Sequence, residues 1–225
     1  MGSAFKRKSL RTLFWITVFG MTMGYFEASI VVYLRELFYP EGFTFPMKDA
    51  STHIILVELG REIMSVGMLI AVAALAGRSF IERFSMFCCM FGIWDIFYYI
   101  FLKLTLGWPE SLLTWDILYL IPVPWIGPVW APVLCSICFI AACLMVVYAE
   151  DHGFSLKPNV KEWAVAIAGG LIIIVSFCEE TPRVLDKQKP ESFAWRIFFP
   201  GLILGLLAFA SAWKRMKKQK NPPRP

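Results

Sequence analysis

Residues 54–76 read IILVELGREIMSVGMLIAVAALA, a run that is long and apolar enough to cross a lipid bilayer. Three ionisable side chains, Glu58, Arg61 and Glu62, nevertheless lie near its start. Charged groups are costly in the hydrocarbon core of a membrane, and they usually face the protein interior or a wet cavity. The stretch therefore predicts a membrane helix with one polar corner, inside a helical bundle that covers that corner.

The whole chain has the composition of a membrane protein. Of its 225 residues, 58% are hydrophobic and 17% are charged, and the mean hydropathy is +0.61. Soluble domains have roughly 45–50% apolar and about 25% charged residues. The formal charge of +5 comes mainly from short basic runs near the two ends, which is typical of membrane topology signals. We expect the lipid bilayer as a partner and no nucleic acid, and the sequence predicts no oligomeric state.

The apolar segments predict an all-α fold, a polytopic membrane bundle of about six transmembrane helices plus one short re-entrant or interfacial helix. Gly20 and Gly24 form a small-residue face that lets another helix approach closely. Pro200 is expected to kink the last helix. We assign 1–213 to a single bundle and expect a basic, Pro-rich tail without packed structure over 214–225. The predicted spans are 13–35, 54–77, 84–106, 129–149, 162–178 and 193–213.

The segment between the third and fourth spans is different in character. Residues 111–121 are apolar, but they are too few to cross a bilayer as a helix. Prolines then interrupt the backbone repeatedly, at Pro122, Pro124, Pro128 and Pro132. We interpret 111–121 as the interfacial or re-entrant half-helix, which carries Asp116 near the water, followed by a proline-rich turn.

The charges also predict an orientation. Both ends of the chain are strongly basic, which favours the cytoplasmic side for both and an even number of spans. The outer loop would then contain Arg183, Lys187 and Lys189, whose positive charge argues against this topology. We expect a multi-pass protein of the cell membrane, plasma or inner, with both termini cytoplasmic.

With that orientation, ionisable residues of separate spans reach similar depths in the outer half of the membrane. We expect them to form one wedge of carboxylates around a central arginine, able to hold a proton, a cation or a polar ligand. A purely structural alternative pairs Arg61 with Glu58 or Glu62 to join helices. The candidate residues are Glu27, Glu58, Arg61, Glu62, Asp95, Tyr98, Tyr99 and Asp116. The candidate metal ligands among them are Glu27, Glu58, Glu62 and Asp95.

Three functions fit these residues. The first is binding or translocation of a small cation, a proton or a polar solute. The second is a membrane-embedded enzyme acting on a lipid-linked substrate, with a hard divalent cation such as Mg²⁺ or Mn²⁺ on the carboxylates. The third is a non-catalytic subunit of a membrane complex. The sequence carries no haem, flavin or nucleotide motif and no HExxH, GxSxG or Walker motif, so the cofactor and any catalytic residues stay open.

Overall fold

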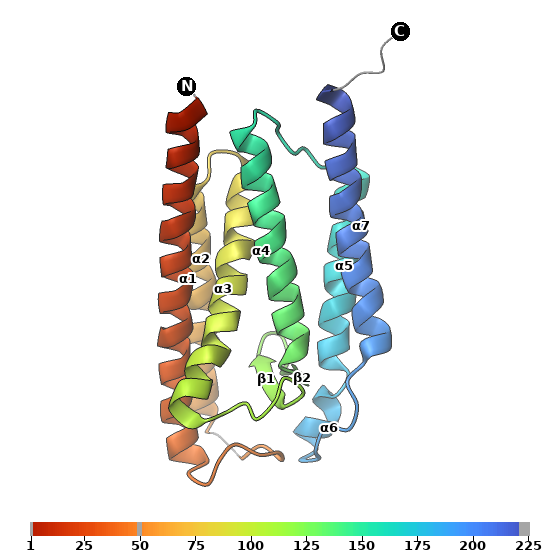
Figure 1. The fold of residues 1–225 in the computed structure, drawn as a ribbon. Coiled ribbons are helices and arrows are strands. Elements are labelled where there is room, and N and C mark those ends of the chain that lie inside the picture. The colour runs from red at the N-terminus through yellow and green to blue at the C-terminus, as the bar shows by residue number, and fades with distance from the viewer. Residues whose placement is uncertain (1, 49–50, 221–225) are drawn as a thin grey trace.

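The computed structural model describes residues 2–48 and 51–220. In this part of the chain, long helices run back and forth through one bundle (Figure 1), which confirms the predicted all-α membrane fold. The long helices are α1 (Gly2–Phe38), α2 (Thr52–Ala76), α3 (Phe80–Leu106), α4 (Trp130–Asp151), α5 (Val160–Cys178) and α7 (Trp195–Lys220). A short helix that the sequence did not predict, α6 (Thr181–Leu185), lies between α5 and α7.

Five helical segments of the described chain have the length and apolar composition of membrane spans. They are Ser9–Phe38, Phe80–Leu106, Trp130–Asp151, Val160–Leu185 and Trp195–Lys218. The remaining long helix, α2, is not among them, and it carries Glu58, Arg61 and Glu62 in its first half. The predicted span over 54–77 is thus not one of the five, although it is the helix from which the charged site was predicted.

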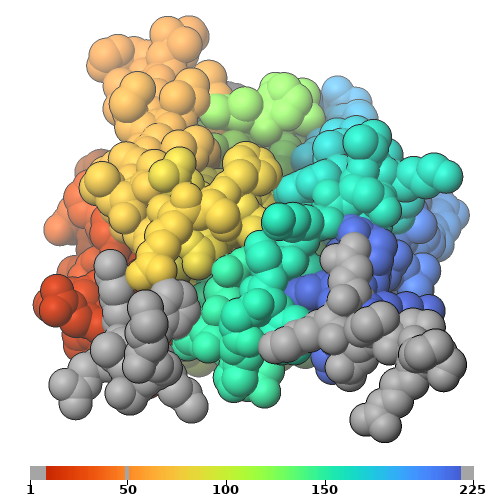
Figure 2. Space-filling model, turned by 90° about the horizontal axis from the view of Figure 1, so that it is seen from above, coloured from red at the N-terminus to blue at the C-terminus, as the bar shows by residue number. Residues whose placement is uncertain are grey.

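The helices alternate in direction, so the start of α1 and the end of α7 lie at the same end of the bundle (Figure 1). Seen from that end, α1 and α7 lie on opposite sides of the molecule (Figure 2), and α3 and α4 lie between them in Figure 1. The loops that follow α1 and α3 both lie at the other end, which we call the hairpin end because the strands are found there. Glu27, Glu58 and Asp95 all belong to the half of the bundle near this end.

Glycines bring neighbouring helices into close contact, as the face of Gly20 and Gly24 predicted. A Cβ atom at Gly24 would lie 2.9 Å from the backbone oxygen of Trp94, so the backbones of α1 and α3 lie close together here. A Cβ at Gly169 would lie 2.7 Å from the backbone oxygen of Gly201, where α5 meets α7. Small residues allow such close packing in a membrane, where apolar burial alone gives little driving force between helices.

At the end with the termini, hydrogen bonds hold α5 against α7. Asn159 caps α5 by accepting from the backbone N–H of Glu162 at 2.9 Å, and the Glu162 side chain accepts in return from the Asn159 N–H at 2.8 Å. The same carboxylate pairs with Arg215 of α7 at 2.7 Å and accepts from Ser211 at 3.0 Å. Glu162 is therefore fully engaged in structure, far from the hairpin end.

The predicted half-helix over 111–121 is wrong, because this segment contains a β-strand. Strand β1 (Trp115–Tyr119) pairs in antiparallel register with β2 (Trp125–Pro128), so that Asp116 faces Gly127. The strand residues WDILY are largely aromatic or aliphatic and fit a pleated surface. Pro122 and Pro124 lie in the connection, where they end the first strand, and the second strand satisfies the backbone of the first. Of the four prolines of the predicted turn, Pro128 instead ends β2 and Pro132 lies in the first turn of α4.

The predicted tail without packed structure is also wrong over its first part. Helix α7 continues through Lys220, past Pro200, which is accommodated inside the helix. Met216 is only 6% exposed and packs with Val146 and Leu156. An apolar residue in the basic segment therefore extends the helix by packing against α4 and the loop after it. Residues 221–225 of the predicted tail lie outside the described residues.

Candidate functional site

Arg61 of α2 lies between two glutamates. Its Nη1 donates to both carboxylate oxygens of Glu27 on α1, and its Nε donates to Glu58 Oε2 at 2.8 Å. The Nη2 atom lies 2.7 Å from the same Glu58 oxygen. The side chains of Arg61, Glu27 and Glu58 are 17%, 12% and 15% exposed, so the group is largely shielded from solvent. We call these three residues the Arg61 cluster.

The Arg61 cluster corrects one part of the structural alternative. The expected partner was Glu58 or Glu62, but the arginine binds Glu58 and Glu27. Glu58 and Arg61 are three residues apart and share a helix face, whereas Glu62 is one residue further around the helix. Glu27 reaches the guanidinium from α1, so the ion pair joins two helices.

Glu62 points to the hairpin instead. It is 6% exposed, and both of its carboxylate oxygens lie within hydrogen-bonding distance of the Leu120 N–H, at 3.1 and 3.0 Å. The Tyr119 hydroxyl donates to the Glu62 backbone oxygen at 3.4 Å. Among the described residues, no Arg, Lys or His side chain forms an ion pair with Glu62. This carboxylate is thus buried, with one neutral donor and no ion pair among the described residues, although the charge of the adjacent Arg61 acts on it.

Asp116 lies on strand β1 and is 2% exposed, so the expectation that it reaches water at the interface is wrong. Its Oδ1 lies 3.3 Å from Nη2 of Arg35, and its Oδ2 accepts from the Tyr99 hydroxyl at 3.3 Å. The Arg35 guanidinium lies 3.7 Å from the ring centre of Trp108. Burial raises the pKa of Asp116 to about 6, although the charge of Arg35 acts in the opposite direction. We call Asp116, Arg35, Tyr99 and Trp108 the Asp116 cluster.

Asp95 belongs to neither cluster by direct contact, whereas Tyr98 lies against the Asp116 cluster. Asp95 of α3 accepts from the Ser136 hydroxyl of α4 at 2.8 Å. Like Glu62, it forms no ion pair with a basic side chain in the described part of the chain. The Tyr98 ring lies next to that of Tyr99, with centres 4.9 Å apart. Asp95 is therefore a second carboxylate in the helical bundle that is held by a neutral donor alone.

The predicted residues thus lie in the same half of the bundle, but they form separate groups instead of one wedge. The Arg61 cluster joins α1 to α2, the Asp116 cluster joins α1 and α3 to the hairpin, and Asp95 joins α3 to α4. No three His, Cys, Asp or Glu side chains within residues 2–48 and 51–220 come together as ligands for a metal ion. The predicted metal ligands Glu27, Glu58, Glu62 and Asp95 therefore do not form an assembled set.

Four partners of these side chains were missed from the sequence: Arg35, Trp108, Ser136 and the backbone N–H of Leu120. Arg35 stands at the end of an apolar run, where an arginine is normally an interface marker. The tryptophan that follows α3 was a usable signal, since arginine often stacks on aromatic rings. The Leu120 N–H had no signal, because a backbone donor depends on the fold of the hairpin.

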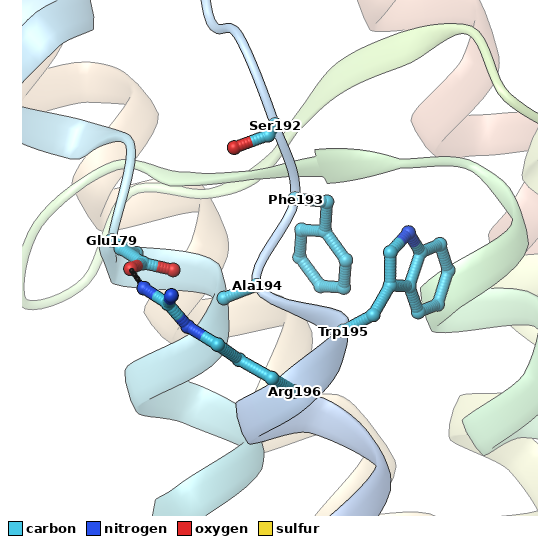
Figure 3. A pocket seen from close by; sticks show the side chains of 6 residues that line it. All are labelled: Glu179, Ser192, Phe193, Ala194, Trp195 and Arg196. Atoms are coloured by element: carbon cyan, nitrogen blue, oxygen red, sulfur yellow. Dashed lines mark hydrogen bonds and ion pairs between the residues drawn. The ribbon is translucent and has the colours of Figure 1, made fainter.

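Two hollows of the described surface lie away from these residues. One, of about 210 Å³, is lined by Glu179, Ser192, Phe193, Ala194, Trp195 and Arg196, with Arg196 paired to Glu179 at 2.9 Å (Figure 3). The other, of about 270 Å³, lies between α1 and α2 near the end with the termini and is lined by Arg11, Thr12, Trp15, Ile16, Val72, Leu75 and Ala76. Neither hollow is lined by any of the eight predicted residues.

The fold and these buried charges define an integral membrane protein with apolar helices that contact the lipid bilayer. No family model matches the chain, and neither a curated protein nor a solved structure is detectably similar to it.

Proposed function

We propose that this membrane protein binds a small cation or a proton at the hairpin end, with Glu62 as the principal ligand and Asp95 as the second. The observation that carries the proposal is that Glu62 is 6% exposed and holds only the Leu120 N–H. A buried carboxylate without a cationic partner is costly, and it gains most by taking up a proton or a cation. Both events are reversible, as a binding function requires.

The neighbouring charges support this assignment because they are already matched. All three nitrogens of Arg61 contact Glu27 or Glu58, which leaves none for Glu62. Arg35 is similarly engaged with Asp116 and the ring of Trp108. The two arginines therefore form ion pairs with three other carboxylates, and neither of them forms one with Glu62 or Asp95.

We also propose that both termini are cytoplasmic and that the hairpin end faces the outside of the cell membrane. The basic runs at both ends of the chain support this orientation. A Lys189→Cys variant tests it, because Lys189 is exposed in the loop after α6. A maleimide that does not cross membranes should label this cysteine in intact cells. Labelling only after the cells are opened would reverse the orientation.

The binding proposal is tested with purified protein in detergent. The midpoint of thermal unfolding is measured in choline, sodium and lithium chloride at equal ionic strength, and again over a range of pH. We expect the midpoint to depend on the cation or on pH, because a ligand that binds only the folded state stabilises it. Glu62→Gln should remove most of this dependence, and Asp95→Asn part of it. Glu36→Gln, on the exposed side of α1 at the same end, is the matched control.

The same experiment addresses a second candidate, the non-catalytic subunit of a membrane complex. This candidate is supported by the position of the two hollows, which lie away from the predicted residues. For such a subunit, Glu62→Gln and Glu36→Gln would show the same dependence on cation and pH as the parent. That result would overturn the binding proposal.

A further inference from the structure

Ser65 of α2 has a buried hydroxyl group that makes no hydrogen bond within the described structure. Ser65 is 1% exposed, and its Oγ has no hydrogen-bond partner in the described structure. Buried hydroxyls are nearly always paired, with protein or with a bound water, because an unpaired one costs free energy. Serines in helices commonly donate to a carbonyl of the preceding turn, as Ser176 does to Ile173 at 2.6 Å. Ser65 does not, which leaves its oxygen available.

The position of Ser65 links it to Glu62. The buried face of α2 consists of Glu62, Ser65, Leu69 and Ala73, in that order along the helix. Residues three apart are neighbours on a helix surface, so the Ser65 hydroxyl lies one turn beyond the Glu62 carboxylate. Leu69 and Ala73, the next two, pack in the apolar core with Met23 and Met90. Ser65 therefore marks the inner limit of the polar part of this face.

We infer that Ser65 Oγ and the Glu62 carboxylate are joint ligands of a small monovalent cation of the Na⁺ class. This inference rests on the proposed function and specifies its ligand. Carboxylate and hydroxyl oxygens are the ligands that hard cations prefer. The single negative charge of Glu62 balances one positive charge, and the hydroxyl adds an oxygen without adding charge. A bare proton needs no second oxygen, so an available hydroxyl beside the carboxylate favours the metal cation.

The test is the equilibrium binding of radioactive Na⁺ to the purified full-length protein and to Ser65→Ala. We expect about tenfold weaker binding for this variant, because one coordinating oxygen is lost. In choline buffer its thermal midpoint should be unchanged or higher, since the deletion removes an unpaired polar atom. The matched control is Ser176→Ala, a serine that is also 1% exposed but whose hydroxyl is satisfied. Its Na⁺ affinity should equal that of the parent.

The outcomes separate the inference from the function beneath it. If Glu62→Gln abolishes Na⁺ binding and Ser65→Ala does not weaken it, Ser65 is no ligand and the proposed function stands. If the parent binds no Na⁺ but unfolds in a pH-dependent way that requires Glu62, the site takes a proton and the inference is overturned. If neither variant changes any response to cation or pH, both the inference and the proposed function are wrong.

Discussion

Glu62 of α2 and Leu120 of the hairpin connection are joined by a single backbone N–H that lies 3.1 and 3.0 Å from the two carboxylate oxygens. The contact ties α2 to the hairpin. One N–H can satisfy only part of a carboxylate, which has about four acceptor sites. We therefore assign Glu62 two roles: it anchors the hairpin, and it keeps oxygen lone pairs free for a ligand.

These two roles can be separated by substitution. Glu62→Gln keeps an amide oxygen that can accept from Leu120, so its stability in choline buffer should stay near that of the parent. Glu62→Ala removes the acceptor and should lower the free energy of unfolding by about 1 kcal/mol, because the half-buried Leu120 N–H loses its partner. Denaturant unfolding of both variants measures the difference. Equal losses for the two would show that the contact with Leu120 does not hold the hairpin.

Arg61→Gln should be among the most damaging single changes in the chain. It leaves Glu27 and Glu58 buried without their counter-charge, and breaking a buried ion pair from one side typically costs about 3–5 kcal/mol. The double variant Arg61→Gln with Glu27→Gln should recover part of that loss, since one unpaired charge is removed. Unfolding free energies of the single and double variants form a mutant cycle. Strictly additive effects would contradict the observed pair between α1 and α2.

The raised pKa of Asp116 should make the stability of the protein depend on pH. Its pKa in the folded chain is about 6, raised by burial from an ordinary 3.8. Between these values the folded chain holds a proton that the unfolded chain has lost, so the stability contributed by this group falls as the pH rises through the window. The parent should thus lose stability relative to Asp116→Asn between about pH 4 and 6.5. A constant difference between the two unfolding curves across that range would refute the prediction.

The close contact of α1 with α3 predicts opposite effects for two glycines. Gly24→Ala places a Cβ 2.9 Å from the Trp94 backbone oxygen, which forces the helices apart and should cost about 1–3 kcal/mol. Gly67→Ala on α2 meets no atom within 4 Å and should be neutral or stabilising by up to about 1 kcal/mol. Thermal unfolding in detergent compares the two. A loss at Gly67 as large as that at Gly24 would mean that helix packing is not the cause.

The sequence was sufficient for the helices because a bilayer demands long apolar segments, and few other structures satisfy that demand. It was not sufficient for residues 111–121. A short apolar run fits a strand or a helix equally well, and only pairing with β2, which was hidden in a proline-rich segment, decides between them. The error carried over to Asp116, which was placed at the interface and is instead 2% exposed.

The depth of a side chain along a helix is also easier to predict from sequence than the direction in which it points around the helix axis. Spacing alone placed Glu27, Glu58 and Glu62 in one half of the bundle. It did not show that Arg61 turns to Glu27 while Glu62 turns to the hairpin, because neighbouring residues on a helix face about 100° apart. Partners such as Leu120 and Ser136 depend on the packing of whole elements, which no local pattern records.

Infrared difference spectroscopy of the purified protein tests the central claim most directly, because it observes the Glu62 carboxyl group itself. Spectra are recorded in sodium chloride and in choline chloride, for the parent, Glu62→Gln and the control Glu36→Gln. We predict cation-induced changes in the carboxyl bands of the parent and of Glu36→Gln that are absent from Glu62→Gln. Cation-induced carboxyl bands that persist unchanged in Glu62→Gln, or no such bands in the parent, would contradict the central claim.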